Sequence, residues 1–175
     1  MKSVINQIET DRLTLISLTL QELEQMRTGV QDFLEKSVLS DVIKLAITDK
    51  IEKLYSLPAD THVFVTYWLI VEQKSGRGVG LIGSKHLPDQ EGYVELGYAV
   101  AEAYRGRGYM TEALTGFLDW LYEWPFIHGA ILRIQDENIP SVRAAESCGF
   151  QKEEIQNGYR IFRYPFETVV SDAEL

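Results

Sequence analysis

The sequence predicts one domain of mixed α/β class, a mostly antiparallel sheet flanked by helices in the order β-αα-βββ-α-β-α-ββ. Three observations lead to this prediction. The 175 residues suffice for one hydrophobic core. Strand-like and helix-like segments are interleaved along the chain. No repeat, low-complexity stretch or linker separates them, so we expect residues 1–175 to form a single domain in which residues 171–175 are disordered.

The first half of the chain predicts one strand, a helical region and a three-stranded meander. Residues 12–17 alternate apolar and polar side chains, as a half-buried strand does. Thr19 and Glu22 have the spacing of a capping box, and an irregular helical pattern continues from Leu20 to Leu57, before Pro58. Three apolar runs separated by turn residues then predict antiparallel strands: 63–72, 78–85 and 93–100.

The second half predicts two helices and three strands. From Thr111 apolar residues recur at helical spacing until Pro125 ends the pattern, and a short apolar strand follows at 130–134. Asn138 is placed to cap the next helix, which Gly149 follows. Two last strands, 152–155 and 159–166, flank Asn157-Gly158, the preferred dipeptide of a tight hairpin turn.

Composition and charge exclude several classes of function. The formal net charge of −9 disfavours nucleic acid and anionic membranes as partners, and suits amine-bearing ones. No run reaches the roughly 18 to 20 apolar residues of a membrane span, and the N-terminus lacks a signal-peptide core, so we expect a cytoplasmic protein. Cys148 is the only cysteine and the three histidines are scattered, so we expect no disulfide and no metal site.

The most informative segment is Tyr104–Thr111, between a predicted strand and a predicted helix. Gly106 and Gly108 allow a ligand to approach the backbone closely, and the unpaired amides that open a helix bind phosphate oxygens. Arg105 and Arg107 add positive charge to an acidic chain. The alternative is an exposed turn with solvated arginines. A nucleotide P-loop is excluded because no Gly-Lys-Ser/Thr follows the glycines, and a dinucleotide fingerprint lacks its third glycine.

Residues 105–110 resemble the Arg/Gln-x-x-Gly-x-Gly/Ala loop of the GNAT acyltransferase superfamily, which holds the pyrophosphate of acetyl-coenzyme A. Met110 departs from the pattern, because it replaces a small residue. Residues 94–100 resemble the fourth strand of that superfamily, and Asn138-x-x-Ser141 resembles its second cofactor-facing segment. Residues 9–13 resemble the opening of the branch that includes ribosomal-protein N-terminal acetyltransferases.

The resemblance implies a GNAT-like fold whose central strands splay apart to receive the cofactor, acetyl-CoA. It also implies which residues bind that cofactor: Tyr98, Ala99, Val100, Arg105, Gly106, Arg107, Gly108, Tyr109, Met110, Thr111, Asn138 and Ser141. Many relatives use a tyrosine in the last helix as the acid toward the departing thiolate, but Ala145 stands at that place here. We therefore assign the proton donation, or a hydrogen bond in its place, to Ser141. Asn138 alternatively serves as a plain helix cap.

Glu95 is the candidate catalytic base, since a neutral amine must attack and its proton must be removed. Strand alternation places Glu95 on one face with Gly97 and Ala99, small residues that leave room for a ligand. The alternative is an ordinary solvent-facing carboxylate. At pH 7 a lysine amine lies about 3.4 pH units from neutrality and an α-amine about one, so an α-amine needs less help.

The predicted function is acyl-CoA-dependent N-acetyl transfer to a primary amine, with a protein N-terminal α-amine preferred over a small-molecule amine. We expect direct transfer in a ternary complex without an acetylated Cys148, because a helix C-terminus disfavours a thiolate. The alternative of another class is a catalytically silent acyl-CoA-binding module. The sequence leaves the acceptor open, as it does the choice between monomer and homodimer.

Overall fold

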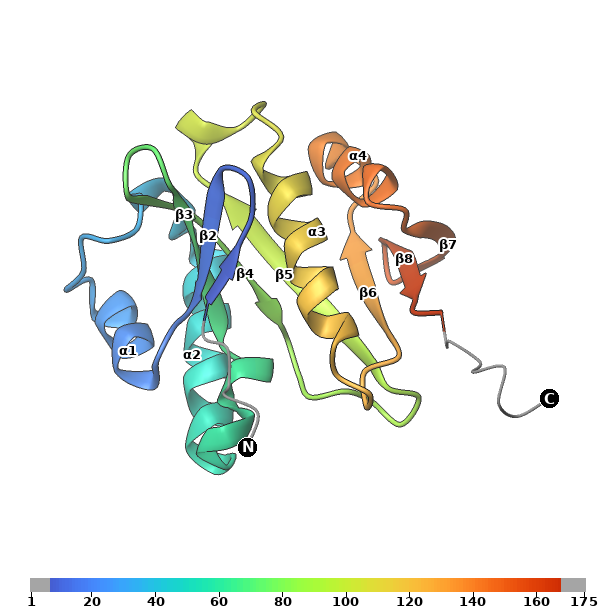
Figure 1. The fold of residues 1–175 in the computed structure, drawn as a ribbon, viewed down its shortest axis with the longest axis horizontal. Coiled ribbons are helices and arrows are strands. Elements are labelled where there is room, and N and C mark those ends of the chain that lie inside the picture. The colour runs from blue at the N-terminus through green and yellow to red at the C-terminus, as the bar shows by residue number, and fades with distance from the viewer. Residues whose placement is uncertain (1–6, 168–175) are drawn as a thin grey trace.

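A computed structural model describes residues 7–167, so the expectation for residues 171–175 lies outside the described part. Eight strands form one sheet in the order β1-β2-β3-β4-β5-β6-β8-β7 (Figure 1). The strands are β1 (Gln7–Glu9), β2 (Leu13–Ser17), β3 (Tyr67–Glu72), β4 (Arg77–Ser84), β5 (Tyr93–Val100), β6 (Gly129–Ile134), β7 (Gln151–Gln156) and β8 (Tyr159–Pro165). The α-helices are α1 (Leu20–Thr28), α2 (Asp41–Ser56), α3 (Tyr109–Tyr122) and α4 (Ile139–Ser147).

The predicted fold class is confirmed. All neighbouring strands pair antiparallel except β5 and β6, which are parallel. The predicted meander is β3-β4-β5, and the hairpin β7-β8 turns at Asn157 and Gly158, both with positive φ. Thr19 and Glu22 form the reciprocal capping box of α1. No described helix has the length and apolar character needed to cross a membrane.

The helices cover both faces of the sheet, and two adjacent residues of β3 show this. The Trp68 ring packs against Phe117 and Trp120 of α3, at centroid distances of 5.8 and 4.8 Å. The next ring toward the N-terminus, Tyr67, lies 4.5 Å from the Lys50 ammonium of α2. Because successive strand side chains point to opposite faces, α3 and α2 lie on opposite sides of the sheet.

Two sequence expectations differ from the structure, and one between them is confirmed. Strand β1 has no counterpart among the predicted elements. The region from Leu20 to Leu57 holds the two helices of the predicted order, since Gly29 ends α1 with a φ of +78° and α2 starts only after the Ser40 cap. The predicted strand 63–72 begins at Tyr67, because residues Ala59–Phe64 form a 3₁₀ helix. There Phe64 is buried in an aromatic cluster with Trp120 and Trp124, which explains its strand-like apolar signal.

Strands β5 and β6 separate part-way along their length. Their pairing covers only three register positions, ending where Glu95 faces Ile131. Beyond that point β5 remains paired with β4 through Leu96–Val100, whereas β6 pairs with β8. The opposite edge of Leu96–Val100 therefore has no strand partner, and its backbone groups can bind an extended ligand.

Candidate active site

The largest cavity described, about 730 Å³, lies where β5 ends and three helices begin. Its wall combines the end of β5, the loop that precedes α3 and the first turns of α2, α3 and α4. Each of these helices starts at a cap that lines the cavity or adjoins it: Ser40, Gly108 and Asn138. Three helix N-termini at one cavity favour a negatively charged ligand there.

The loop before α3 has a conformation that requires glycine. Gly106 and Gly108 have φ values of +77° and +78°, a region that other residues rarely adopt. Gly108 is the N-cap of α3 and has no side chain to occupy the first-turn amides. Arg12 fixes the loop from outside, since its guanidinium donates to the Arg107 carbonyl at 2.8 Å and binds Glu112 at 2.7 Å.

The structure brings nearly all of the predicted cofactor-binding residues to this cavity. The lining includes Tyr98, Ala99, Val100, Arg105, Gly106, Gly108, Tyr109, Met110, Thr111, Asn138 and Ser141. Arg107 is the exception: its guanidinium stacks 4.9 Å from the Tyr104 ring and lies 3.5 Å from Glu72. Arg107 thus stabilises the loop through these contacts and does not line the cavity.

Three of these residues connect β5 to the start of α4. The Tyr98 hydroxyl donates to the Ser141 carbonyl at 3.3 Å, and burial raises the pKa of Tyr98 to about 12. The Asn138 side chain accepts a hydrogen bond from the Ser141 amide at 3.4 Å, so it caps α4 while lining the cavity. Ala145 is fully buried one turn further on, where it presents no proton donor.

Glu95 lies outside the cavity wall, further along β5. Its carboxylate is bound by Lys85 of the segment after β4, at 2.7 Å, and by Arg133 of β6, at 3.3 Å. Burial alone raises the pKa of Glu95, but the two cations outweigh it and hold the pKa below its usual value. The carboxylate is therefore ionised near neutral pH, as a proton acceptor must be.

Part of the cavity wall escaped the sequence analysis. The N-cap Ser40 and Val42 and Ile43 of α2 line the cavity, although they lie fifty residues or more before β5 in the chain. Pro140 and Arg143 complete the α4 side. No motif marked the α2 residues, because their position depends on how α2 packs on the sheet.

A family model described as an acetyltransferase (GNAT) domain matches residues 12–151. The chain belongs to the GNAT acetyltransferase family. This acetyltransferase is 22% identical over 155 residues to the uncharacterized N-acetyltransferase p20 of Bacillus licheniformis, covering 86% of this chain and 85% of that protein. It is 29% identical over 83 residues to the uncharacterized N-acetyltransferase YjdG of Bacillus subtilis (strain 168), where the match spans 47% of this chain and about half, 49%, of YjdG.

Solved structures share the fold of this acetyltransferase. A ribosomal L7/L12 alpha-N-protein acetyltransferase in complex with coenzyme A superposes with a TM-score of 0.66 at 15% identity, covering 91% of this chain and 97% of that one. A spermidine N-acetyltransferase chimera from Vibrio cholerae and hSSAT superposes with a TM-score of 0.61 at 17% identity, covering 87% and 93%. Because one neighbour is named for a protein N-terminus and the other for a polyamine, fold alone does not select the acceptor.

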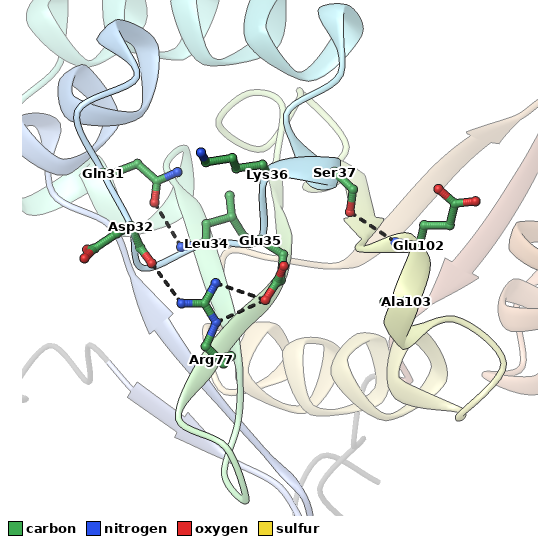
Figure 2. A pocket seen from close by; sticks show the side chains of 9 residues that line it. All are labelled: Gln31, Asp32, Leu34, Glu35, Lys36, Ser37, Arg77, Glu102 and Ala103. Atoms are coloured by element: carbon green, nitrogen blue, oxygen red, sulfur yellow. Dashed lines mark hydrogen bonds and ion pairs between the residues drawn. The ribbon is translucent and has the colours of Figure 1, made fainter.

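A second cavity of this acetyltransferase, about 660 Å³, lies beside the loop 31–37 and contains none of the predicted residues. Figure 2 shows that the Arg77 and Ser37 side chains bind other groups of its wall. Arg77 binds Glu35 at 3.0 Å and the Asp32 carbonyl, while the Ser37 hydroxyl accepts from the Glu102 amide. These groups are already paired within the wall, so we assign the chemistry to the larger cavity.

Cys148 of this acetyltransferase is not placed as a nucleophile. It is the C-cap of α4, and burial raises the pKa of its thiol. Its sulfur lies 3.6 Å from the Thr111 carbonyl and 3.5 Å from the Thr115 hydroxyl, so no base adjoins it among these contacts. A thiol with a raised pKa at a helix C-terminus is a poor nucleophile.

We expect Cys148→Ala to keep most of the wild-type activity, and initial-rate plots over both substrates to intersect, because so poor a nucleophile predicts direct attack of the amine on the acyl donor. Circular dichroism of the variant controls for folding. Parallel initial-rate lines combined with an inactive, folded variant would refute direct transfer.

Proposed function

We propose that this chain transfers an acetyl group from acetyl-CoA to a primary amine, with the α-amine of a protein N-terminus preferred over a small-molecule amine as acceptor. The observation that carries the proposal is the cavity at the start of α3. There, two glycines of positive φ precede unpaired helix amides, and the free edge of β5 leads away from them.

The residues present fit acetyl-CoA. The amides of Tyr109, Met110 and Thr111 open α3 at the cavity, and they would bind the pyrophosphate with the guanidinium of Arg105 nearby. The free edge of β5 would bind the pantetheine amides as a strand partner does. When bound, acetyl-CoA supplies the thioester whose acyl carbon the amine attacks.

Proton transfer is assigned to two side chains. Glu95 accepts the amine proton, directly or through one water, as the C–N bond forms. The C–S bond breaks at the same carbon, and the departing sulfur takes a proton at the start of α4. We assign Ser141 there, as the proton donor or as the donor of a hydrogen bond to the sulfur in its place. Tyr98 lies beside it, and its raised pKa keeps its proton at physiological pH.

The pH dependence follows from the lowered pKa of Glu95. Since the free enzyme already carries the carboxylate, only the acceptor has still to lose a proton as pH rises. We expect kcat/KM to increase with pH up to the pKa of the acceptor amine, near about 8 for an α-amine. For acceptors with a higher amine pKa, the rise of kcat/KM with pH should extend to a correspondingly higher pH. A limb that stays fixed for all acceptors and disappears in Glu95→Gln would assign that limb to Glu95 and contradict its lowered pKa.

The direct test of the function is amine-dependent release of free CoA. Incubation with acetyl-CoA and mixed amines, followed by a thiol reagent, should show release that requires an amine. Mass spectrometry should find the acetylated acceptor. Binding of acetyl-CoA without release from any amine would instead identify a silent acyl-CoA-binding module.

A further inference from the structure

We infer that the acceptor of this acetyltransferase carries a carboxylate close to its amine, and that Lys85 and Arg133 bind this carboxylate. The inference rests on the proposed function and names the substrate class for the same site. It starts from the face of β5 that carries Glu95, Gly97 and Ala99.

This face connects the cofactor cavity to the two cations. Ala99 lines the cavity, and Glu95 follows it on the same face after Gly97. At a rise of about 3.3 Å per residue, Glu95 lies roughly 13 Å from Ala99 and half that from Gly97. Gly97 has no side chain, and the nearest atom to its missing Cβ is the Lys85 side chain, at 3.4 Å. An acceptor in front of Gly97 therefore meets Lys85.

Both cations keep hydrogen-bonding capacity for a ligand. Lys85 gives one of three ammonium protons to Glu95, at 2.7 Å. Arg133 binds Glu95 through Nε and the Gln156 side chain through Nη1, which leaves further guanidinium protons. Their side chains are 49% and 39% exposed, against 15% for Glu95. They are thus open to a ligand from solvent.

These ion pairs compensate the burial of the Glu95 carboxylate, which is 15% exposed. Two cations around one carboxylate also leave an excess positive charge, in a chain whose net charge is −9. That excess lies beside the proposed base, where it would repel a polyamine and attract a carboxylate.

Two flanking cations are paired with carboxylates of their own. Lys53 of α2 donates to the Lys85 carbonyl at 2.9 Å, and its own charge is paired with Asp49 at 2.9 Å. Arg163 of β8 is paired with Glu153 at 3.0 Å. Each flanking cation therefore has its own partner, whereas Lys85 and Arg133 share one.

Matched acceptors test the inference and distinguish two sources of the carboxylate. L-Alanine against L-alaninamide tests the α-carboxylate of a free amino acid. Ala-Glu-amide against Ala-Gln-amide tests an acidic side chain next to a peptide N-terminus. Spermidine serves as the cationic probe. With rates corrected for the fraction of neutral amine, we expect at least one carboxylate acceptor to exceed its amide by about tenfold or more in kcat/KM.

Arg133→Gln separates ligand binding from structure. Loss of the contact with Glu95 should lower the rates of both acceptors alike, so the readout is their ratio. We expect the variant to remove most of the carboxylate preference by raising KM for the carboxylate acceptor more than for its amide partner. Arg160→Gln is the control, because Arg160 sits on the same strand pair but binds Asp136 at 3.2 Å. This control should leave the preference unchanged.

The possible failures are distinguishable. Turnover of amides or spermidine at rates equal to those of the carboxylate acceptors would overturn this inference and leave the proposed function intact. An unchanged preference in Arg133→Gln would also overturn it. Absence of CoA release with every acceptor would overturn both proposals.

Discussion

Glu95→Gln is expected to lower kcat by about 10²–10⁴-fold with little change in the affinity for acetyl-CoA. The substitution preserves size and removes the only proton acceptor on the β5 face that leads from the cavity. Cofactor affinity should persist because Glu95 does not line the cavity where the cofactor is proposed to bind. Kinetics at saturating acetyl-CoA and calorimetry of CoA binding measure the two quantities.

Glu153→Gln is the matched control for this experiment. Glu153 is also held by an arginine, Arg163, but on the outer hairpin and away from the cavity lining. It should retain nearly full activity. A loss below about threefold in Glu95→Gln, under conditions where chemistry limits turnover, would remove Glu95 from the mechanism.

Gly108→Val is expected to weaken CoA binding at least tenfold, or by about 1.4 kcal/mol. Two effects combine to displace the loop. The new side chain would crowd the Arg12 guanidinium, which lies 3.4 Å from the missing Cβ and holds the loop, and a φ of +78° is strained for valine. Calorimetric titration with CoA measures the affinity, and thermal unfolding measures the cost to stability.

Gly29→Val is the control that measures the effect of backbone strain at a positive φ, away from the cavity. Gly29 has the same φ of +78°, no atom within 4 Å of its missing Cβ, and no place in the cavity. We expect a similar loss of stability with unchanged CoA affinity. If Gly108→Val binds CoA as tightly as the wild type, the α3 amides do not hold the pyrophosphate.

Features that depend on neighbours along the chain were predictable from the sequence alone. The Thr19–Glu22 capping box, the Asn138 cap and the Asn157-Gly158 turn all lie where their local patterns placed them. The strand at 93–100 was predicted with its observed bounds. The glycine loop before α3 was also readable, because two glycines before a helix express a local backbone requirement.

Only the tertiary structure decided which residues far apart in the chain are in contact. The position of Val42 in the cavity wall depends on the packing of α2, and the direction of the Arg107 side chain depends on Glu72 and Tyr104. Lys85 and Arg133 form ion pairs with Glu95 only because β5, β6 and the segment after β4 meet on one face of the sheet. Sequence periodicity reports which face a residue occupies, whereas the charges it meets there depend on strand order and register.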